Sequence, residues 1–202
     1  MKKLITVLML VFVALIVAAC GGQTPSSAAQ PAPAKTAPTA ASEGLQGKKT
    51  LIAYFTYSGT TERAAQDAQK IIGGDLFKIA TVNPYPSAYR ECTEVAKAEM
   101  QNDARPALQG TLPDKQNYDV IFIGYPIWWH QAPMAVFSFI EKSNLSGKTV
   151  VLFCTSGGSD ISETLPKLHD ALNKKNAKVI DGITVNRPQG IDEWLNKLGY
   201  KK

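Results

Sequence analysis

The sequence predicts a three-layer α/β sandwich, in which helices cover both faces of a five-stranded parallel sheet. Short runs of apolar and β-branched residues alternate along the chain with stretches whose apolar residues recur every three or four positions. Two of the runs, 120–124 and 150–154, are continuously apolar, as strands buried on both faces of a sheet usually are. Together these patterns favour repeated strand–helix–strand units and hence a parallel sheet.

The chain of 202 residues begins with a predicted export signal. Lys2 and Lys3 precede an apolar run over 4–19, which is shorter than the ~20 residues of a membrane-spanning helix. Residues 17–20 read Val-Ala-Ala-Cys, which resembles the lipobox of bacterial lipoproteins, where cleavage leaves a lipidated cysteine at the N-terminus. We therefore predict a lipoprotein signal peptide over 1–19 and lipidation of Cys20. The alternative is an ordinary signal peptide with a chance cysteine.

Residues 20–47 are predicted to form a disordered tether. They are rich in Gly, Pro, Ala, Ser and Thr and too poor in large apolar side chains to offset the entropy of ordering. The folded domain is expected over 48–202. The formal net charge of +5 falls to +3 when Lys2 and Lys3 are subtracted, and no dense run of Lys and Arg follows. Nucleic-acid binding is therefore not expected.

Within the domain, five strands and about four or five helices are expected. The strands are predicted over 50–56, 76–80, 120–124, 149–154 and 179–185. Helical spacing appears at Ala64, Ala68 and Ile71, again from near 87 with Cys92, Ala96 and Met100, and in 161–172 and 191–198.

Ligands of such open sheets bind beyond the carboxyl ends of the strands, where the strand order reverses. This rule directs attention to the loops 56–61, 125–133 and 155–160. The first loop is rich in hydroxyls and leads from a strand into a helix. Hydroxyls and free backbone N–H groups at a helix N-terminus bind anions, so we predict a phosphate site there.

The second loop contains adjacent tryptophans, Trp128 and Trp129. At least one ring is expected to be exposed or to face a ligand, because adjacent loop residues point in different directions, and a flat heteroaromatic ring would stack on it. The alternative is that both rings plug the end of the sheet. In the third loop, paired glycines allow close approach of a ligand to the backbone. A plain turn, with Ser159 or Asp160 capping the next helix, is the alternative.

Residues 124–129 read Gly-Tyr-Pro-Ile-Trp-Trp, and residues 56–61 read Thr-Tyr-Ser-Gly-Thr-Thr. With these motifs, residues 49–200 resemble the flavodoxin superfamily, and more narrowly flavodoxin-like proteins that carry the Trp-Trp motif. In that group the first loop typically reads Ser-x-Ser-Gly-Asn-Thr, so Thr60 replaces the usual asparagine. The resemblance implies a strand order 2-1-3-4-5 and FMN as the cofactor.

The resemblance also implies which residues hold the FMN. By this resemblance, the residues that bind the phosphate are Thr56, Ser58, Gly59, Thr60 and Thr61, with Tyr57 flanking the flavin. The residues that contact the isoalloxazine are Pro126, Ile127, Trp128 and Trp129, with His130 adjoining them. The residues that line the polar edge of the isoalloxazine are Thr155, Ser156, Gly157, Gly158 and Ser159.

The remaining titratable residues suggest no other site. His130 is expected at the rim of the flavin face, with protonation of a bound quinone as its alternative role, and His169 is expected to be solvated. Cys92 and Cys154 are expected to be buried and free, and no cysteine or histidine cluster has metal-ligand spacing.

The leading functional hypothesis is an FMN-binding electron-transfer lipoprotein outside the cytoplasm, with a redox protein or a quinone as its partner. The first alternative is an FMN-dependent oxidoreductase that reduces a quinone or another small acceptor. The second alternative is a binding module that has lost the flavin. The hydroxyl loop argues against that last hypothesis.

Overall fold

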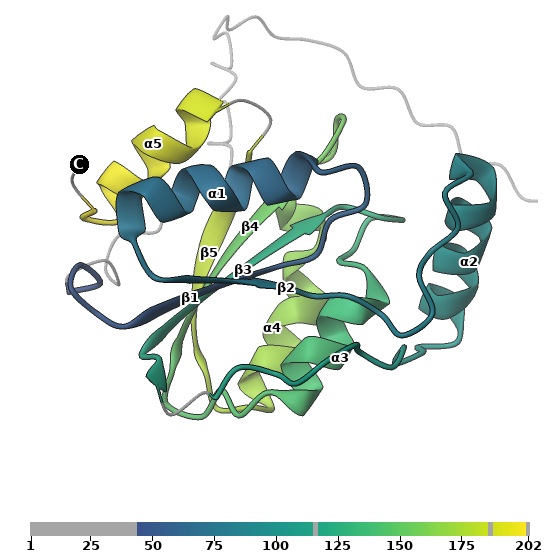
Figure 1. Ribbon diagram of the computed structural model, residues 1–202, viewed down its shortest axis with the longest axis horizontal. Helices are drawn as coiled ribbons and strands as arrows, with labels where there is room; N and C mark the ends of the chain where they lie inside the picture. Colours follow the sequence, from purple (N-terminus) through teal and green to yellow (C-terminus); the bar gives the residue numbers. More distant parts are fainter. Residues whose placement is uncertain (1–43, 115–116, 186–187, 201–202) are drawn as a thin grey trace, which may run out of the picture. The chain divides into compact units, whose positions relative to one another are not determined.

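A computed structural model describes residues 44–114, 117–185 and 188–200. Strands and helices alternate along this part of the chain (Figure 1). The strands are β1 (Thr50–Tyr54), β2 (Asp75–Lys78), β3 (Val120–Pro126), β4 (Thr149–Thr155) and β5 (Lys178–Thr184). The helices are α1 (Thr60–Ile72), α2 (Tyr89–Gln101), α3 (Met134–Lys142), the 3-10 turn η2 (Ile161–Glu163), α4 (Leu165–Asn173) and α5 (Pro188–Lys197).

The five strands form one parallel sheet in the order β2-β1-β3-β4-β5. This order confirms the predicted fold class, and it places the point where the strand order reverses between β1 and β3. The register aligns Tyr54 with Gly124, and Gly124 with Phe153. The carboxyl ends of β1, β3 and β4 therefore meet at one edge of the sheet.

Alternating side chains of the strands supply two separate cores. Ile121 and Ile123 pack toward α3 and α4, whereas Phe122 packs toward α1 and α5. Figure 1 shows the two helix pairs on opposite faces of the sheet, with α2 standing beside its carboxyl end. Because central strands are apolar on both sides, their continuous hydrophobic runs are explained.

Helix α1 illustrates how local sequence sets an element. Its buried face consists of Thr61, Ala64, Ala65 and Ala68, small residues that let the helix lie close to the sheet. Its N-cap, Gly59, has φ 85°, a left-handed conformation in which glycine lacks the steric cost of a side chain. The chain turns sharply from β1 into α1 at this residue.

Several sequence-based boundaries were wrong. β1 ends at Tyr54 rather than at 56, whereas β3 and β4 continue to Pro126 and Thr155, because their backbones stay paired with each other beyond the apolar runs. The helix expected over 161–172 begins as a separate 3-10 turn. Helix α3 was not predicted, because residues 134–140 are all buried and show no polar face.

The folded domain also starts earlier than predicted. Leu45 was assigned to the tether, but it is only 5% exposed and packs in the core shared with α1 and α5. A single leucine in a polar segment carries no periodicity that would have revealed this packing. The predicted signal peptide, Cys20 and residues 20–43 of the tether lie outside the described residues. Among the described helices, none has the length and apolar character needed to cross a membrane.

Candidate functional site

The hydroxyl-rich loop between β1 and α1 has the geometry of an anion site. The Thr56 hydroxyl accepts a hydrogen bond from the Gly59 backbone N–H at 3.1 Å, and it retains its own hydrogen for donation. Ser58 and Thr60 are exposed, and their hydroxyl oxygens lie 3.2 Å apart. The N–H groups in the first turn of a helix have no intrahelical acceptor, and in α1 no side chain caps them. Hydroxyls and helix dipole together favour a bound anion.

Thr61 and Thr155 have a different task from their neighbours. Both are buried, and their hydroxyl oxygens lie 2.8 Å apart, so the pair ties the loop after β1 to the end of β4. The carbonyl of Thr155 also accepts from the Ile127 N–H at 3.0 Å. All three loops singled out in the sequence therefore join at Thr155. The buried hydroxyls of this pair position the loops instead of facing the open site.

The loop after β3 contains a tight turn built on two strained residues. The Trp128 N–H donates to the Gln131 carbonyl at 2.9 Å, and the Gln131 N–H donates back at 3.1 Å. Between them Trp129 and His130 have φ 48° and 61°. Two positive φ angles in a two-residue loop define a type I′ turn, which normally carries Asn-Gly. Each side chain held in this region costs roughly 1–2 kcal/mol.

Side-chain bonds from three other elements hold this turn in place. The Trp129 indole Nε1 donates to the Thr93 carbonyl of α2 at 3.1 Å. His130 Nδ1 lies 2.7 Å from Glu163 Oε2 in η2. Below the turn, the Lys167 ammonium of α4 donates to Gln131 Oε1 at 2.7 Å. The turn is thus anchored on both sides and from beneath.

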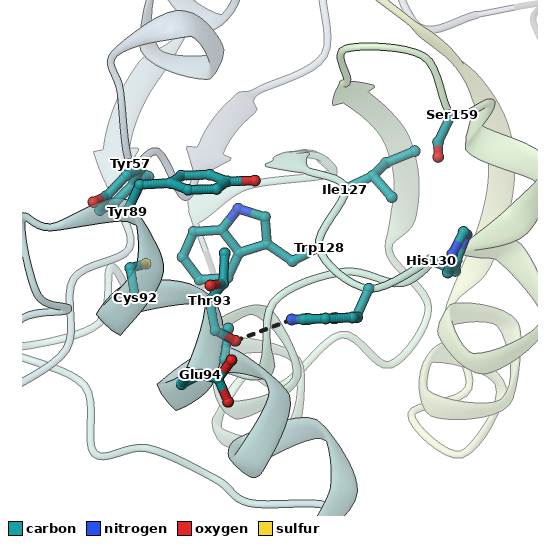
Figure 2. Close-up of a pocket in the computed structure, with 11 residues that line it drawn as sticks. Tyr57, Tyr89, Cys92, Thr93, Glu94, Ile127, Trp128, His130 and Ser159 are labelled. Atoms are coloured by element: carbon teal, nitrogen blue, oxygen red, sulfur yellow. Dashed lines mark hydrogen bonds between the residues drawn. The ribbon is translucent and has the colours of Figure 1, made fainter.

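A cavity of about 480 Å³ opens between the Trp-Trp turn and α2. Figure 2 shows Trp128 at its centre, with Tyr57 and Tyr89 on one side and Ile127 and Ser159 on the other. Trp129 is 41% exposed, so one ring of the pair is exposed, as the sequence predicted. Two tyrosines and two tryptophans line the cavity, which suits a flat ring.

Trp128 is held by other aromatic rings instead of by a polar contact. It meets Phe55, Tyr57 and Tyr85 edge-on, with ring centroids 5.1–5.9 Å apart. The Tyr57 hydroxyl is anchored in turn by the carbonyls of Pro86 and Ser87, at 3.0 and 2.7 Å. Tyr57 therefore belongs both to the hydroxyl loop and to the cavity wall.

The loop after β4 is a compact turn with open space above it. The Ser156 hydroxyl accepts from the N–H groups of Gly158 and Ser159, at 3.2 and 2.8 Å. Gly157 and Gly158 are exposed, neither has a left-handed φ, and a Cβ on either would meet no atom within 4 Å. Nothing in the chain itself requires glycine at these positions. A ligand that approaches the backbone closely would require it.

Asp160, rather than Ser159, caps the helical turn that follows. Its Oδ1 accepts from the Ser162 N–H at 3.0 Å, and Glu163 completes the capping box. The second oxygen of Glu163 meets His130, and this hydrogen bond holds the pKa of the Glu163 carboxyl below its ordinary value. The side chain of His130 is 80% exposed at the cavity rim, the position expected from the sequence.

Two groups near the cavity stay uncharged, one of them on α2 and the other in the segment before it. Burial raises the pKa of the Cys92 thiol, which lines the cavity floor. Burial, and to a lesser extent a 2.6 Å hydrogen bond to Glu99, raises the pKa of Tyr85.

Both cysteines are buried and free, as expected. In contrast to expectation, His169 is only half-exposed and its Nε2 lies 2.5 Å from Asp181.

The structure brings six of the predicted residues into the cavity wall. They are Tyr57, Ile127, Trp128, Trp129, His130 and Ser159. The hydroxyls of the first loop do not line the cavity. Tyr57, which belongs to the same loop, is the residue that connects the two. The contribution of α2 was missed, namely Tyr89, Cys92, Thr93, Glu94 and Ala96. Their helical spacing signals one face of α2, but it does not reveal that part of this face borders a cavity.

Known proteins share this fold and part of the sequence. A sequence profile of the flavodoxin family matches residues 49–198. A candidate flavoprotein from Bacteroides eggerthii, known from a crystal structure, is 39% identical, with a TM-score of 0.68 over 76% of this chain and 99% of its own. Another from Bacteroides uniformis is 34% identical, with a TM-score of 0.67 over 75% and 99%.

A flavoprotein from Lactobacillus acidophilus, crystallised in complex with FMN, is 22% identical, with a TM-score of 0.63 over 73% of this chain and 99% of its own. No protein with a curated description matches the chain.

Proposed function

The chain belongs to the flavodoxin family, and from this premise we propose that it binds FMN and carries electrons as a lipid-anchored protein outside the cytoplasm. The observation that carries the proposal is the meeting, at one sheet edge, of an uncapped helix N-terminus rich in hydroxyls with a cavity lined by tyrosines and tryptophans. These are the two chemistries that a phosphate joined to a flat ring requires. The complex of the Lactobacillus acidophilus flavoprotein with FMN supports this choice of ligand.

The residues present fit FMN. The hydroxyls of Thr56, Ser58 and Thr60, with the first N–H groups of α1, would hold the phosphate. Tyr57, Ile127 and Trp128 would contact the ring. The open space above Gly157 and Gly158 would admit its polar edge to the backbone N–H groups. When bound, FMN supplies the redox chemistry, and the protein tunes its potential and limits access to it.

The side chains described above would shape the inner part of the cavity. The edge-on cluster around Trp128 excludes water from the inner wall. The raised pKa of Cys92 keeps its thiol protonated, so no thiolate competes as a reductant or nucleophile. The carboxylate of Glu163 is engaged with His130 and with the Asp160 N–H, at 2.7 and 3.4 Å.

The test of this proposal is the absorbance of protein purified from cells, followed by titration of the apo-protein with FMN. The double variant S58A/T60A removes two hydroxyl donors to a dianion. At about 1.5 kcal/mol for each hydrogen bond to a charged group, FMN should bind about 100-fold more weakly. A matched control, S146A/T111A, removes two exposed hydroxyls far from the loop and should bind FMN as the wild type does. A colourless protein that ignores added FMN would contradict the proposal.

A second candidate function is an FMN-dependent oxidoreductase that acts on a quinone or another small acceptor. The observation that favours it is the open cavity with His130 at its rim, where an imidazole could hand a proton to a bound acceptor. Steady-state turnover with soluble quinones separates the two functions. Turnover that falls in H130A while FMN binding is unchanged would favour the enzyme.

A further inference from the structure

The amino-terminal edge of the sheet, opposite the cavity, carries a row of lysines. Lys48 and Lys49 precede β1, Lys148 precedes β4, and Lys178 begins β5. Backbone bonds align them, since the Lys178 N–H donates to the Lys148 carbonyl at 2.9 Å. Three of these lysines line a second cavity, of about 520 Å³, together with Asp119. We call this surface the lysine edge.

The positive charges of the lysine edge are not neutralised within the described chain. None of its four ammonium groups forms an ion pair or hydrogen bond with a described residue, whereas Lys70 and Lys78 are paired with carboxylates. The one carboxylate lining the cavity is Asp119, whose Oδ2 accepts from the Lys49 N–H at 3.3 Å. Among the residues that line the cavity, three lysines against one aspartate give a net charge of +2.

The chain enters the domain at this same edge. Gly44 and Leu45 line the lysine-edge cavity, and Leu45 is fixed in the core. Everything that precedes residue 44 must therefore connect here. If residues 20–43 behave as a flexible coil, their ends lie on average about 25–30 Å apart. An anchor on Cys20 would hold the lysine edge within that distance of the bilayer.

We propose that the lysine edge docks on the headgroups of anionic phospholipids. The proposal rests on the lipid anchor of the proposed function, because the anchor places this edge near the bilayer. Unpaired lysines around a hollow match a surface of phosphates, and each lysine at an anionic membrane strengthens binding about fivefold. Three lysines together strengthen it about 100-fold.

Docking in this way fixes where the cavity points and which partner can reach it. Strands of seven residues separate the two edges of the sheet by about 23 Å, at ~3.3 Å per residue. The cavity with Trp129 then faces the aqueous side, away from the lipid. The electron partner must accordingly reach the site from the aqueous compartment, and a quinone dissolved in the bilayer cannot reach it.

The domain can be studied without its anchor. The buried core lies within residues 45–200, and the aligned segment matches 99% of the Bacteroides eggerthii chain, which was crystallised. The experiment uses an unlipidated chain that begins at residue 21. Its binding is measured by co-sedimentation, at low salt, with phosphatidylcholine vesicles that contain or lack phosphatidylglycerol.

The variant K48Q/K148Q/K178Q should bind the phosphatidylglycerol vesicles about 100-fold more weakly, and the corresponding triple arginine variant should retain binding. The matched control R63Q/K78Q/R90Q removes the same charge from exposed residues at the opposite edge and should bind as the wild type does. Equal loss in the control would overturn the proposal, as would equal binding to vesicles of phosphatidylcholine alone. Competition by millimolar inorganic phosphate would show a small-anion site and overturn membrane docking.

Orientation is tested by iodide quenching of Trp129, obtained as the difference between the wild type and W129F. The quenching should be the same with and without phosphatidylglycerol vesicles, and protection by vesicles would overturn the proposed orientation. FMN binding is measured separately in each variant. A protein that binds vesicles but no FMN refutes the proposed function alone, whereas a yellow protein indifferent to anionic vesicles refutes the docking alone.

Discussion

Replacing Gly157 with alanine should move folding stability and ligand affinity in opposite directions. Gly157 is exposed, its φ is not left-handed, and an added Cβ would meet no atom of the chain within 4 Å. Alanine at such a position stabilises a protein by about 0.4–1 kcal/mol, because it restricts the unfolded chain. For a domain of this size, that gain corresponds to a rise in Tm of about 1–4 °C.

The same methyl group occupies space that FMN would use. If the isoalloxazine lies against the backbone of this loop, G157A should bind FMN at least about tenfold more weakly, a loss of about 1.4 kcal/mol. Stability is measured by thermal unfolding of the apo-protein, because bound ligand would itself raise the Tm. Affinity is measured by fluorescence titration with FMN. A variant that is more stable and binds FMN with unchanged affinity would refute the placement of the ring at this loop.

Gly124 provides the contrasting case. A Cβ there would lie 2.2 Å from the ring of Phe153, which is fully buried. G124A should therefore destabilise the apo-protein by about 1–3 kcal/mol, the usual cost of overpacking a core. If both glycine variants changed stability in the same direction, the distinction between a ligand-facing and a packing glycine would be wrong.

Three further predictions concern groups whose protonation or bonding the structure fixes. Cys92 and Cys154 should resist alkylation at pH 8 in the folded protein and react after unfolding, because burial raises the pKa of Cys154 to about 12 and also raises that of Cys92; fast labelling of either native thiol would contradict this. The pKa of Glu163 is depressed in the folded state, so its bond to His130 stabilises the fold above the ordinary glutamate pKa, and this contribution is lost as the pH falls through the depressed value. H130A should raise the Glu163 pKa in a carbon-13 NMR titration and make the acid limb of stability shallower, whereas an unchanged titration would exclude the pair. Y125F should cost about 1 kcal/mol in denaturant unfolding, because it removes a buried hydrogen bond of 2.7 Å, and a neutral result would show that the bond is not needed.

The sheet could be predicted from the sequence because its signals are local. Continuous apolar runs and the spacing of residues such as Leu168 and Leu172 reflect burial that each segment experiences as a whole. Helix α3 escaped prediction for the same reason, since burial on every side of residues 134–140 leaves no polar face to set a period. The carboxyl-terminal ends of β3 and β4 were not predicted, because the pairing between two strands is not visible in the sequence of either strand alone.

The candidate site was predicted in its loops but not in its contacts. Hydroxyls, tryptophans and paired glycines can be recognised in the sequence by residue type, and the strand order places their loops at the carboxyl edge of the sheet. The wall contributed by α2 depends on how that helix is docked. The pairing of His130 with Glu163 joins residues 33 positions apart, and no pattern in the sequence connects them.

The Trp-Trp turn shows most clearly what the sequence conceals. Its backbone would suit Asn-Gly, yet it carries Trp129 and His130 at a cost of roughly 1–2 kcal/mol each. A more flexible sequence would remove that cost, but it would also remove the indole that donates to Thr93 and the imidazole that meets Glu163. These contacts tie the turn to α2 on one side and to η2 on the other, so the strained pair spans the mouth of the cavity. Backbone strain of this kind persists where the surrounding structure fixes it, and it is concentrated at functional sites. The strain is therefore an argument for function at this edge that is independent of the hydroxyl loop.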